Sequence, residues 1–128
     1  HPRDRRQRQM CIRDSFKVDS LENMRTVIIE SLRYYANLRY ATGEVNRLLI
    51  VDRDSDNYLI LLEGWENRER IHGCLVHLQI IDNKIWIQRD GIEHGIATDL
   101  LEAGIPNNKI VLGFKSEHIR PYTGFAIK

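Results

Sequence analysis

The carboxylates of Asp52, Asp54 and Asp56 alternate with the spacing that opens an EF-hand calcium loop. Such a loop also needs a glycine at its sixth position and an acidic residue at its twelfth. Asn57 stands where the glycine should be, and the residues that should complete the loop form a predicted strand. The pattern therefore favours a solvated hairpin turn over a calcium site.

Cys74 and four histidines, His72, His77, His94 and His118, supply the ligand types of a zinc site. His72 and Cys74 alternate on one face of a predicted strand, whereas His77 falls on its other face. The sequence contains no CxxC or HxxxH spacing. We therefore predict no metal site, and we interpret Cys74 as a buried structural thiol rather than a nucleophile beside a base.

Tryptophan beside arginine occurs twice at the ends of predicted strands. Arg68 and Arg70 follow Trp65, and Arg89 follows Trp86. This combination is typical of protein-interface hot spots, and arginine with aromatics also binds nucleic-acid bases and backbone. Alternatively, both tryptophans close the core while the arginines are solvated. The sequence does not decide between these interpretations.

The C-terminal tail carries a similar combination. Arg120, Tyr122 and Phe125 either clamp a partner or dock the end of the chain, and both alternatives stay open. Together with the strand-end residues they complete a predicted partner-binding set: Trp65, Arg68, Arg70, Trp86, Arg89, Arg120 and Tyr122.

Templates for nucleotide binding and hydrolysis are absent from the sequence, which has no GxGxxG, Walker, GxSxG or HExxH motif. Carboxylates are numerous, but nothing selects two of them as an acid–base pair. We therefore expect a protein that is not an enzyme, with no catalytic residues and no cofactor.

Residues 1–15 contain a basic stretch that resembles a translated sequencing adapter. Arg5 to Asp14 back-translate as CGT CGG CAG CGT CAG ATG TGT ATA AGA GAC, which matches a widely used transposase adapter in one frame. Asp4 and Asp14 argue against a mitochondrial-type leader, and no long apolar run follows as a secretory signal requires. We expect residues 1–15 to be non-native and disordered.

Setting residues 1–15 aside changes the charge balance. The whole chain has 19 Lys and Arg against 18 Asp and Glu, with a formal charge of +1. Without these residues fourteen bases face sixteen acids, a formal charge of −2, which removes the composition argument for non-specific DNA binding. One thiol remains, which fits a reducing cytoplasm. We expect residues 16–128 to form a single cytoplasmic domain without a membrane span.

The elements that would position these residues follow from hydrophobic periodicity. Asp19 and Glu22 have capping-box spacing before an amphipathic helix that is predicted to end near Leu38. Strands are predicted at 46–52, 58–65, 71–80 and 85–88, with short turns between them. Cys74, Val76, Leu78 and Ile80 are expected to share one face of the third strand.

A short helix around Ile96 and Leu100 stops at Gly104 and Pro106, and a last short strand or extended segment covers 110–114. The sequence thus predicts an α+β fold: a long N-terminal helix packed on an antiparallel β-meander, with a second short helix and an extended C-terminal tail.

From about 19 to 128 the sequence resembles the XisI-like family, proteins linked to control of fdxN element excision in cyanobacteria. The stretches that carry the resemblance are GWENRERIHGCLVHLQIIDNKIWIQRDG, GIATDLLEAGIPNNKIVLGF and HIRPYTGFAIK. The order of these pieces is specific, although no single piece is. The resemblance also implies a native start at Val18, read from a GTG codon.

The resemblance implies an accessory role in site-specific excision beside a XisH-like protein or a separate recombinase. It carries over no catalytic residue. Our leading hypothesis is a non-catalytic factor that acts through protein contacts, with a homodimer as one form of association. The alternative is a direct DNA-binding module that uses Arg68, Arg70, Arg89 and Arg120, which requires these arginines to cluster on one face.

Overall fold

The computed structural model describes residues 20–38 and 44–128, and all structural statements concern these residues. The expectations for residues 1–15, Val18 and Asp19 lie outside them. Helices and strands occur in the following order: α2 (Leu21–Ala36), β1 (Glu44–Asp52), β2 (Asn57–Glu66), β3 (Glu69–Ile81), β4 (Lys84–Asp90), α3 (Ile96–Glu102), η1 (Asn107–Lys109), β5 (Ile110–Leu112) and η2 (Arg120–Tyr122).

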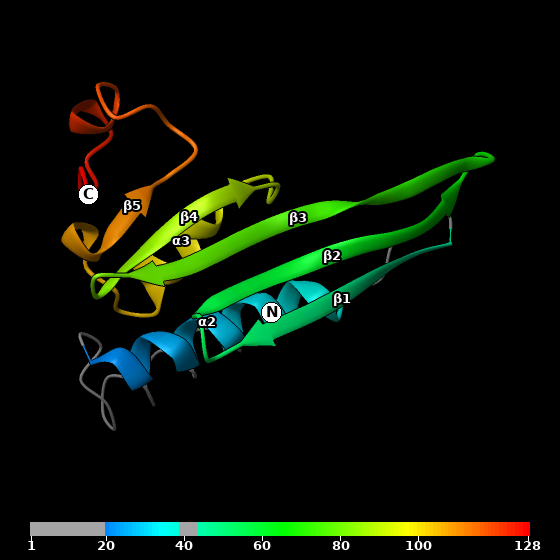
Figure 1. Cartoon of the computed structure of the whole chain (residues 1–128), viewed down its shortest axis with the longest axis horizontal. Coiled ribbons are helices and arrows are strands. Elements are labelled where there is room, and N and C mark those ends of the chain that lie inside the picture. Colours follow the sequence, from blue (N-terminus) through cyan, green and yellow to red (C-terminus); the bar gives the residue numbers. More distant parts are fainter. Residues whose placement is uncertain (1–19, 39–43) are drawn as a thin grey trace.

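The sheet has the strand order β1-β2-β3-β4-β5 (Figure 1). The pairs from β1 to β4 are antiparallel, which confirms the predicted α+β meander. β5 instead pairs with β4 in parallel, through Ile85 and Ile110 among others. A parallel neighbour needs a crossover connection, and α3 lies in that connection.

Ser20 is the N-cap of helix α2, whereas the sequence predicts the cap one residue earlier, at Asp19. The Ser20 Oγ accepts a hydrogen bond from the Asn23 N–H at 3.2 Å, which satisfies one free N–H of the first turn. Glu22 therefore lies inside the first turn, where a carboxylate is stabilised by the helix dipole. The helix ends at Ala36, two residues before the predicted end.

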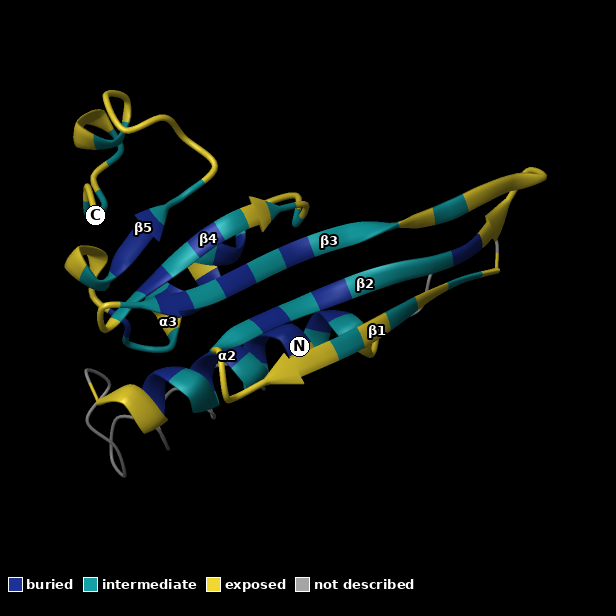
Figure 2. Cartoon of the chain, viewed as in Figure 1, coloured by how far each residue is buried: buried dark blue, intermediate teal, exposed yellow. Residues whose placement is uncertain are grey.

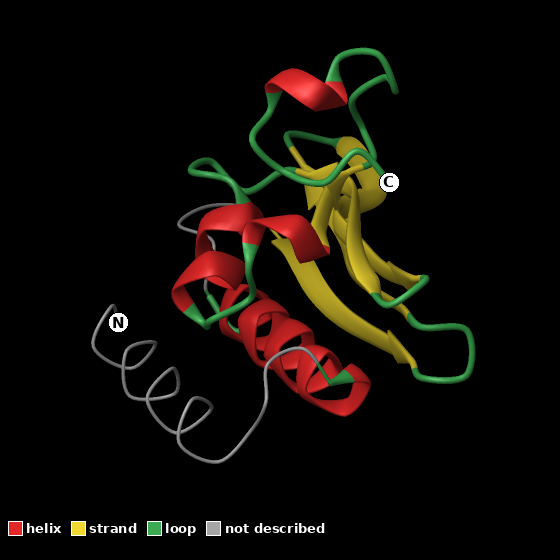
Figure 3. Ribbon diagram, turned by 90° about the vertical axis from the view of Figure 1, so that its left-hand side faces the viewer, coloured by secondary structure: helices red, strands yellow, loops and turns green. Residues whose placement is uncertain are grey.

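The core lies between α2, α3 and one face of the sheet, as the side view of Figure 3 shows. Figure 2 shows the buried positions alternating along β2, β3 and β4. No helix among residues 20–38 and 44–128 is long and apolar enough to cross a membrane. The fully buried residues include Met24, Ile28 and Leu32 of α2, Tyr58 and Ile60 of β2, Val76 and Leu78 of β3, and Ile85 and Ile87 of β4.

A β-bulge at Leu75 corrects the predicted face assignment of β3. Val76 pairs with Ile60, whereas Cys74 pairs with the next residue Leu61, so Leu75 has no opposite residue. Because a bulge shifts the alternation by one, Cys74 lies on the face of His77 and not on the face of Val76. The prediction that Cys74 and Val76 share a face is therefore wrong.

The turn between β1 and β2 is tied to α2 by an ion pair. Arg25 donates from Nε to Asp56 Oδ1 at 2.8 Å and from Nη2 to Oδ2 at 3.2 Å. The Tyr58 hydroxyl donates to Asp56 Oδ1 at 2.7 Å. The hydrogen bond from Arg25 lowers the pKa of Asp56, while burial, reinforced by Asp56, raises the pKa of Tyr58 to about 12. The predicted turn is thus a structural element that fixes the helix against the hairpin.

Helix α3 is joined to α2 by a buried polar cluster. The Tyr35 hydroxyl donates to Asp99 Oδ2 at 2.7 Å, and the carboxylate is 2% exposed. The His94 Nε2 lies 2.8 Å from the Tyr35 hydroxyl and 3.2 Å from Asp99 Oδ2. At the start of α3, the Asp90 carboxylate accepts from the Ile96 N–H at 3.0 Å.

The Arg25–Asp56 pair predicts an acid-dependent stability. The variant Asp56→Asn should lose about 1–3 kcal/mol of unfolding free energy at pH 7, because charge-assisted hydrogen bonds are lost. The folded-state pKa of Asp56 lies below its ordinary value of 3.8, so this stabilisation is present above that value and lost as the pH falls through the folded-state pKa. Urea unfolding at pH 7 and at lower pH measures the difference in unfolding free energy between wild type and variant. This difference should become smaller as the pH falls.

The matched control is Asp54→Asn, which changes an exposed carboxylate of the same turn and should alter stability by less than about 0.5 kcal/mol. A difference in unfolding free energy between wild type and Asp56→Asn that does not depend on pH would contradict a stabilising role for the ionised Asp56 carboxylate.

The buried cluster predicts that Tyr35→Phe destabilises the fold by about 1–3 kcal/mol, because the Asp99 carboxylate loses a donor in the interior. Chemical denaturation at pH 7 is the measurement, with Tyr122→Phe as a control at a hydroxyl on the exposed tail. Equal stability of Tyr35→Phe and wild type would show that the hydroxyl contributes nothing to the α2–α3 contact.

Candidate functional site

The face of the sheet opposite α2, here called the outer face, carries most of the predicted partner-binding residues. The pairing register places Trp65 opposite Arg70, Trp86 opposite Gln79 and Arg89 opposite His77. Residues directly opposite in an antiparallel pair point to the same side of the sheet. The outer face includes Leu48, Ile50, Leu59, Leu61, Trp65, Arg70, His72, Cys74, His77, Trp86 and Arg89.

The β2–β3 hairpin extends past the end of α2, and residues 63–72 form its end, here called the hairpin end (Figure 1). The Trp65 side chain is 52% exposed there, and the Arg70 guanidinium lies 5.5 Å from the centroid of its ring. Gly64 allows β1 to come close, because a Cβ on it would lie 1.9 Å from the Glu44 carbonyl oxygen. Asn67 and Arg68 adopt positive φ angles of 52° and 68° in the turn.

The hairpin end has more acidic than basic residues. Glu63, Glu66 and Glu69 lie within it, and Glu44 of β1 pairs with Trp65. Arg68 and Arg70 are its basic residues, so residues 63–72 have a formal charge of −1 with neutral histidine, and Glu44 brings the total to −2. Glu44 and Glu63 share the outer face with Trp65 and Arg70, and tryptophan beside arginine is typical of protein-binding surfaces.

Trp86 and Arg120 instead hold the C-terminal tail on the sheet. The Arg120 guanidinium lies 5.0 Å from the centroid of the Trp86 ring. Its Nε donates to the Lys115 carbonyl at 3.0 Å, and its Nη1 donates to the Ile127 carbonyl at 3.2 Å. The geometry therefore supports the docking interpretation for Arg120, while Tyr122 points away from the sheet and is 86% exposed.

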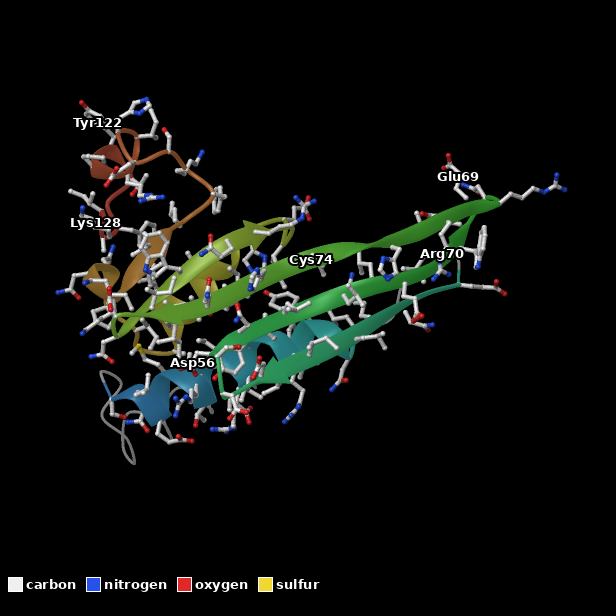
Figure 4. The ribbon with its side chains drawn as sticks, in the orientation of Figure 1. Asp56, Glu69, Arg70, Cys74, Tyr122 and Lys128 are labelled. Atoms are coloured by element: carbon white, nitrogen blue, oxygen red, sulfur yellow. The ribbon has the colours of Figure 1, made fainter. Side chains whose placement is uncertain are left out.

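The predicted residues form two groups rather than one. Trp65 lies opposite Arg70 of β3, and Trp86 lies opposite Gln79 of the same strand. These two positions are nine residues apart, a separation of about 30 Å along the strand. Figure 4 shows Arg70 and Tyr122 toward opposite ends of the molecule. Arg89 lies between these ends and donates from Nε to the Cys74 carbonyl at 2.7 Å. The four arginines of the DNA-module hypothesis therefore do not form one cluster.

The residues considered as metal ligands or nucleophile also do not form a site. His72, Cys74 and His77 share the outer face because of the bulge, which corrects the prediction that His77 lies on the other face. Burial raises the pKa of the Cys74 thiol and lowers the pKa of His77, whose Nε2 lies 2.8 Å from Asn57 Oδ1. Within the described residues, no group of three potential ligands could hold a metal ion.

The polar cluster of the buried Tyr35 and Asp99 with the exposed His94 was not predicted from the sequence. It borders a cavity of 370 Å³ whose lining also includes Arg47 and Leu75. The helical stripe of α3 was assigned to apolar residues, yet Asp99 lies three residues after the buried Ile96 and faces the same way. An acidic residue at a core-facing helical position was the available signal.

The hairpin end was also not predicted as a projecting element. The signal was strand length, because β3 has 13 residues while β4 has 7, so part of β3 has no partner on that side. Strand patterns alone, without strand lengths, do not show this projection.

Comparison with known proteins agrees with this architecture. The family model described as XisI protein matches residues 18–127. A XisI-like protein from Anabaena variabilis ATCC 29413 has a crystal structure with a TM-score of 0.79 and 29% sequence identity, covering 85% of this chain and 100% of that one.

A second crystal structure, of fdxN element excision controlling factor XisI from the same organism, has a TM-score of 0.70 and 37% identity, covering 82% of this chain and 96% of that one. No curated protein matches the chain. The family match spans most of the sequence and the fold agrees with both structures, so the chain belongs to the XisI family.

Proposed function

We propose that this protein is a non-catalytic accessory factor that controls excision of a DNA element, and that it acts in the cytoplasm through protein contacts. The family match supports a role in excision, since a relative is named fdxN element excision controlling factor XisI. The partner would be a XisH-like protein or a recombinase complex. The hairpin end would make the contact.

The observation that carries this proposal is the exposed Trp65–Arg70 stack on the hairpin end. Tryptophan and arginine dominate binding energy at protein interfaces when a partner removes water around them. Trp65 is 52% exposed, so a partner could bury a large remaining area. Glu44 and Glu63, which share its face of the sheet, would favour a partner with a basic surface and would guide the encounter.

The same charges weigh against the direct DNA-binding alternative. Affinity for DNA comes largely from lysine and arginine contacts to phosphates, whereas the hairpin end together with Glu44 carries a formal charge of −2. Arg120 is held by two carbonyls of its own tail and by Trp86. The four arginines considered for DNA binding are therefore separated from one another, and Arg120 already has partners within the tail.

The proposal predicts that Trp65→Ala weakens binding to a XisH-like protein about tenfold or more, because the central aromatic contact is lost. Titration calorimetry with the purified pair is the measurement. Phe114→Ala is the matched control, since Phe114 is an aromatic residue of similar exposure, at 47%, outside the hairpin end. Equal losses for both variants, or no loss for Trp65→Ala, would contradict the assigned contact.

The proposal also predicts that a chain beginning at Val18, which lacks the basic residues 1–15, does not bind duplex DNA by itself. Fluorescence anisotropy across a salt series is the measurement. Tight binding with a steep salt dependence in the absence of a partner would overturn the accessory role in favour of the DNA-binding module.

A further inference from the structure

The two edge strands of the sheet, β5 and β1, differ in whether another segment covers their free side. β5 is three residues long, and the tail covers its outer side through the Val111–Ala126 bridge, with the Ala126 N–H donating to the Ile110 carbonyl at 2.8 Å. β1 is nine residues long and, within the described residues, pairs only with β2. A long strand paired on one side presents a row of free N–H and C=O groups to a further strand.

β1 also lacks several of the features by which edge strands avoid association. It contains no proline and no lysine, and its register with β2 shows no bulge. Arg47 is turned toward α2, where its Nη1 donates to the Tyr35 carbonyl at 2.8 Å. Along the outer face, Leu48 is 38% exposed and Ile50 is 41% exposed. An edge of this length, with exposed apolar residues and with its central charge, Arg47, held against α2, is suited to pairing.

The sequence of β1 fits an antiparallel pairing with a second copy of itself. In a dimer with a two-fold axis normal to the sheet, the outer faces of both copies lie on the same side. Residues opposite each other must then belong to the same face, so the register is centred on one residue that lies opposite its own copy. A centre at Leu48 places Glu44 opposite Asp52 twice, a centre at Arg47 places Arg47 opposite its own copy, and a centre at Ile50 pairs only five residues of β1, 48–52. Like charges directly opposite are destabilising.

A centre at Leu49 avoids these clashes within β1. It places Leu48 opposite Ile50 and Asn46 opposite Asp52, and each pair occurs twice by symmetry. The seven residues 46–52 would then form roughly six to eight hydrogen bonds between the copies, as alternate pairs exchange two each. On the outer face apolar residues lie opposite apolar residues and an amide lies opposite a carboxylate, while on the inner face Arg47 lies opposite Val51.

We propose that this edge is a dimer interface, in which β1 pairs with β1 of a second copy in the register centred on Leu49. The two sheets then form one continuous sheet with both α2 helices on the same side. Because the pairing is antiparallel, the two hairpin ends lie at opposite ends of the dimer. Each dimer would thus present two separated binding ends.

The test is a charge-swap experiment in the full chain, measured by sedimentation equilibrium. The wild type should be a dimer, whereas Leu48→Glu and Ile50→Lys should each shift the equilibrium toward monomer by tenfold or more. Mixing the two variants should restore a dimer, because the introduced carboxylate of one copy would face the introduced ammonium group of the other. The second Leu–Ile pair stays intact in that mixed dimer. Both sites are exposed, so circular dichroism should show native folding.

Ile119→Lys is the matched control, since Ile119 is 42% exposed on the C-terminal tail and should leave the dimer unchanged. Amide hydrogen exchange on the unmodified chain gives a second readout, with protection expected at all β1 amides between 46 and 52 rather than at alternate ones. A wild-type monomer with alternate protection would overturn the proposal, as would variants that remain dimeric. Full protection of β1 that appears only with a XisH-like protein would instead assign the edge to that partner.

Discussion

The burial of one apolar face of α2 against one face of the sheet organises the rest of this structure. Met24, Ile28 and Leu32 are fully buried there. The 16 residues of α2 span about 24 Å, whereas the 13 residues of β3 span about 43 Å. One helix of this length cannot cover the whole hairpin, so the hairpin end projects beyond the core. Trp65 lies on the outer face of that projecting end, on the side of the sheet away from α2, and is 52% exposed there.

The outer face is divided by what covers it. The tail lies over Trp86 and is held by Arg120 and by the bridge to β5, which protects one edge of the sheet. In the described part of the chain, no helix covers the middle of the outer face, around Leu61 and Cys74, or the hairpin end. A small domain that leaves one sheet face and one long edge open is suited to act through other proteins, and this agrees with the proposed accessory role.

Hydrophobic periodicity predicted most of the fold because it reports directly on burial. The run of Met24, Ile28, Leu32 and Tyr35 marks the buried face of α2, and the strand patterns locate all four strands of the meander. The bulge at Leu75 was missed because the apolar Cys74 continues the alternation of Val76, Leu78 and Ile80, which hides the shift in phase.

The polar contacts were harder to predict than the fold. Asp99 and Tyr35 are 64 positions apart, so their hydrogen bond depends on how two helices meet, which local pattern does not contain. The predicted partner-binding set shared a composition, tryptophan beside arginine, but composition could not show that Arg120 serves the tail while Arg70 stacks on an exposed ring. The distinction arises from strand length and tail docking, which are properties of the assembled sheet.

The measurement that tests the central claim most directly is amide hydrogen exchange of the full chain with and without a XisH-like protein, in the absence of DNA. The account predicts that added protection is concentrated in residues 63–72, at the hairpin end. Protection confined to residues 110–128, or no change until DNA is added, would contradict a protein contact made through this end of the sheet.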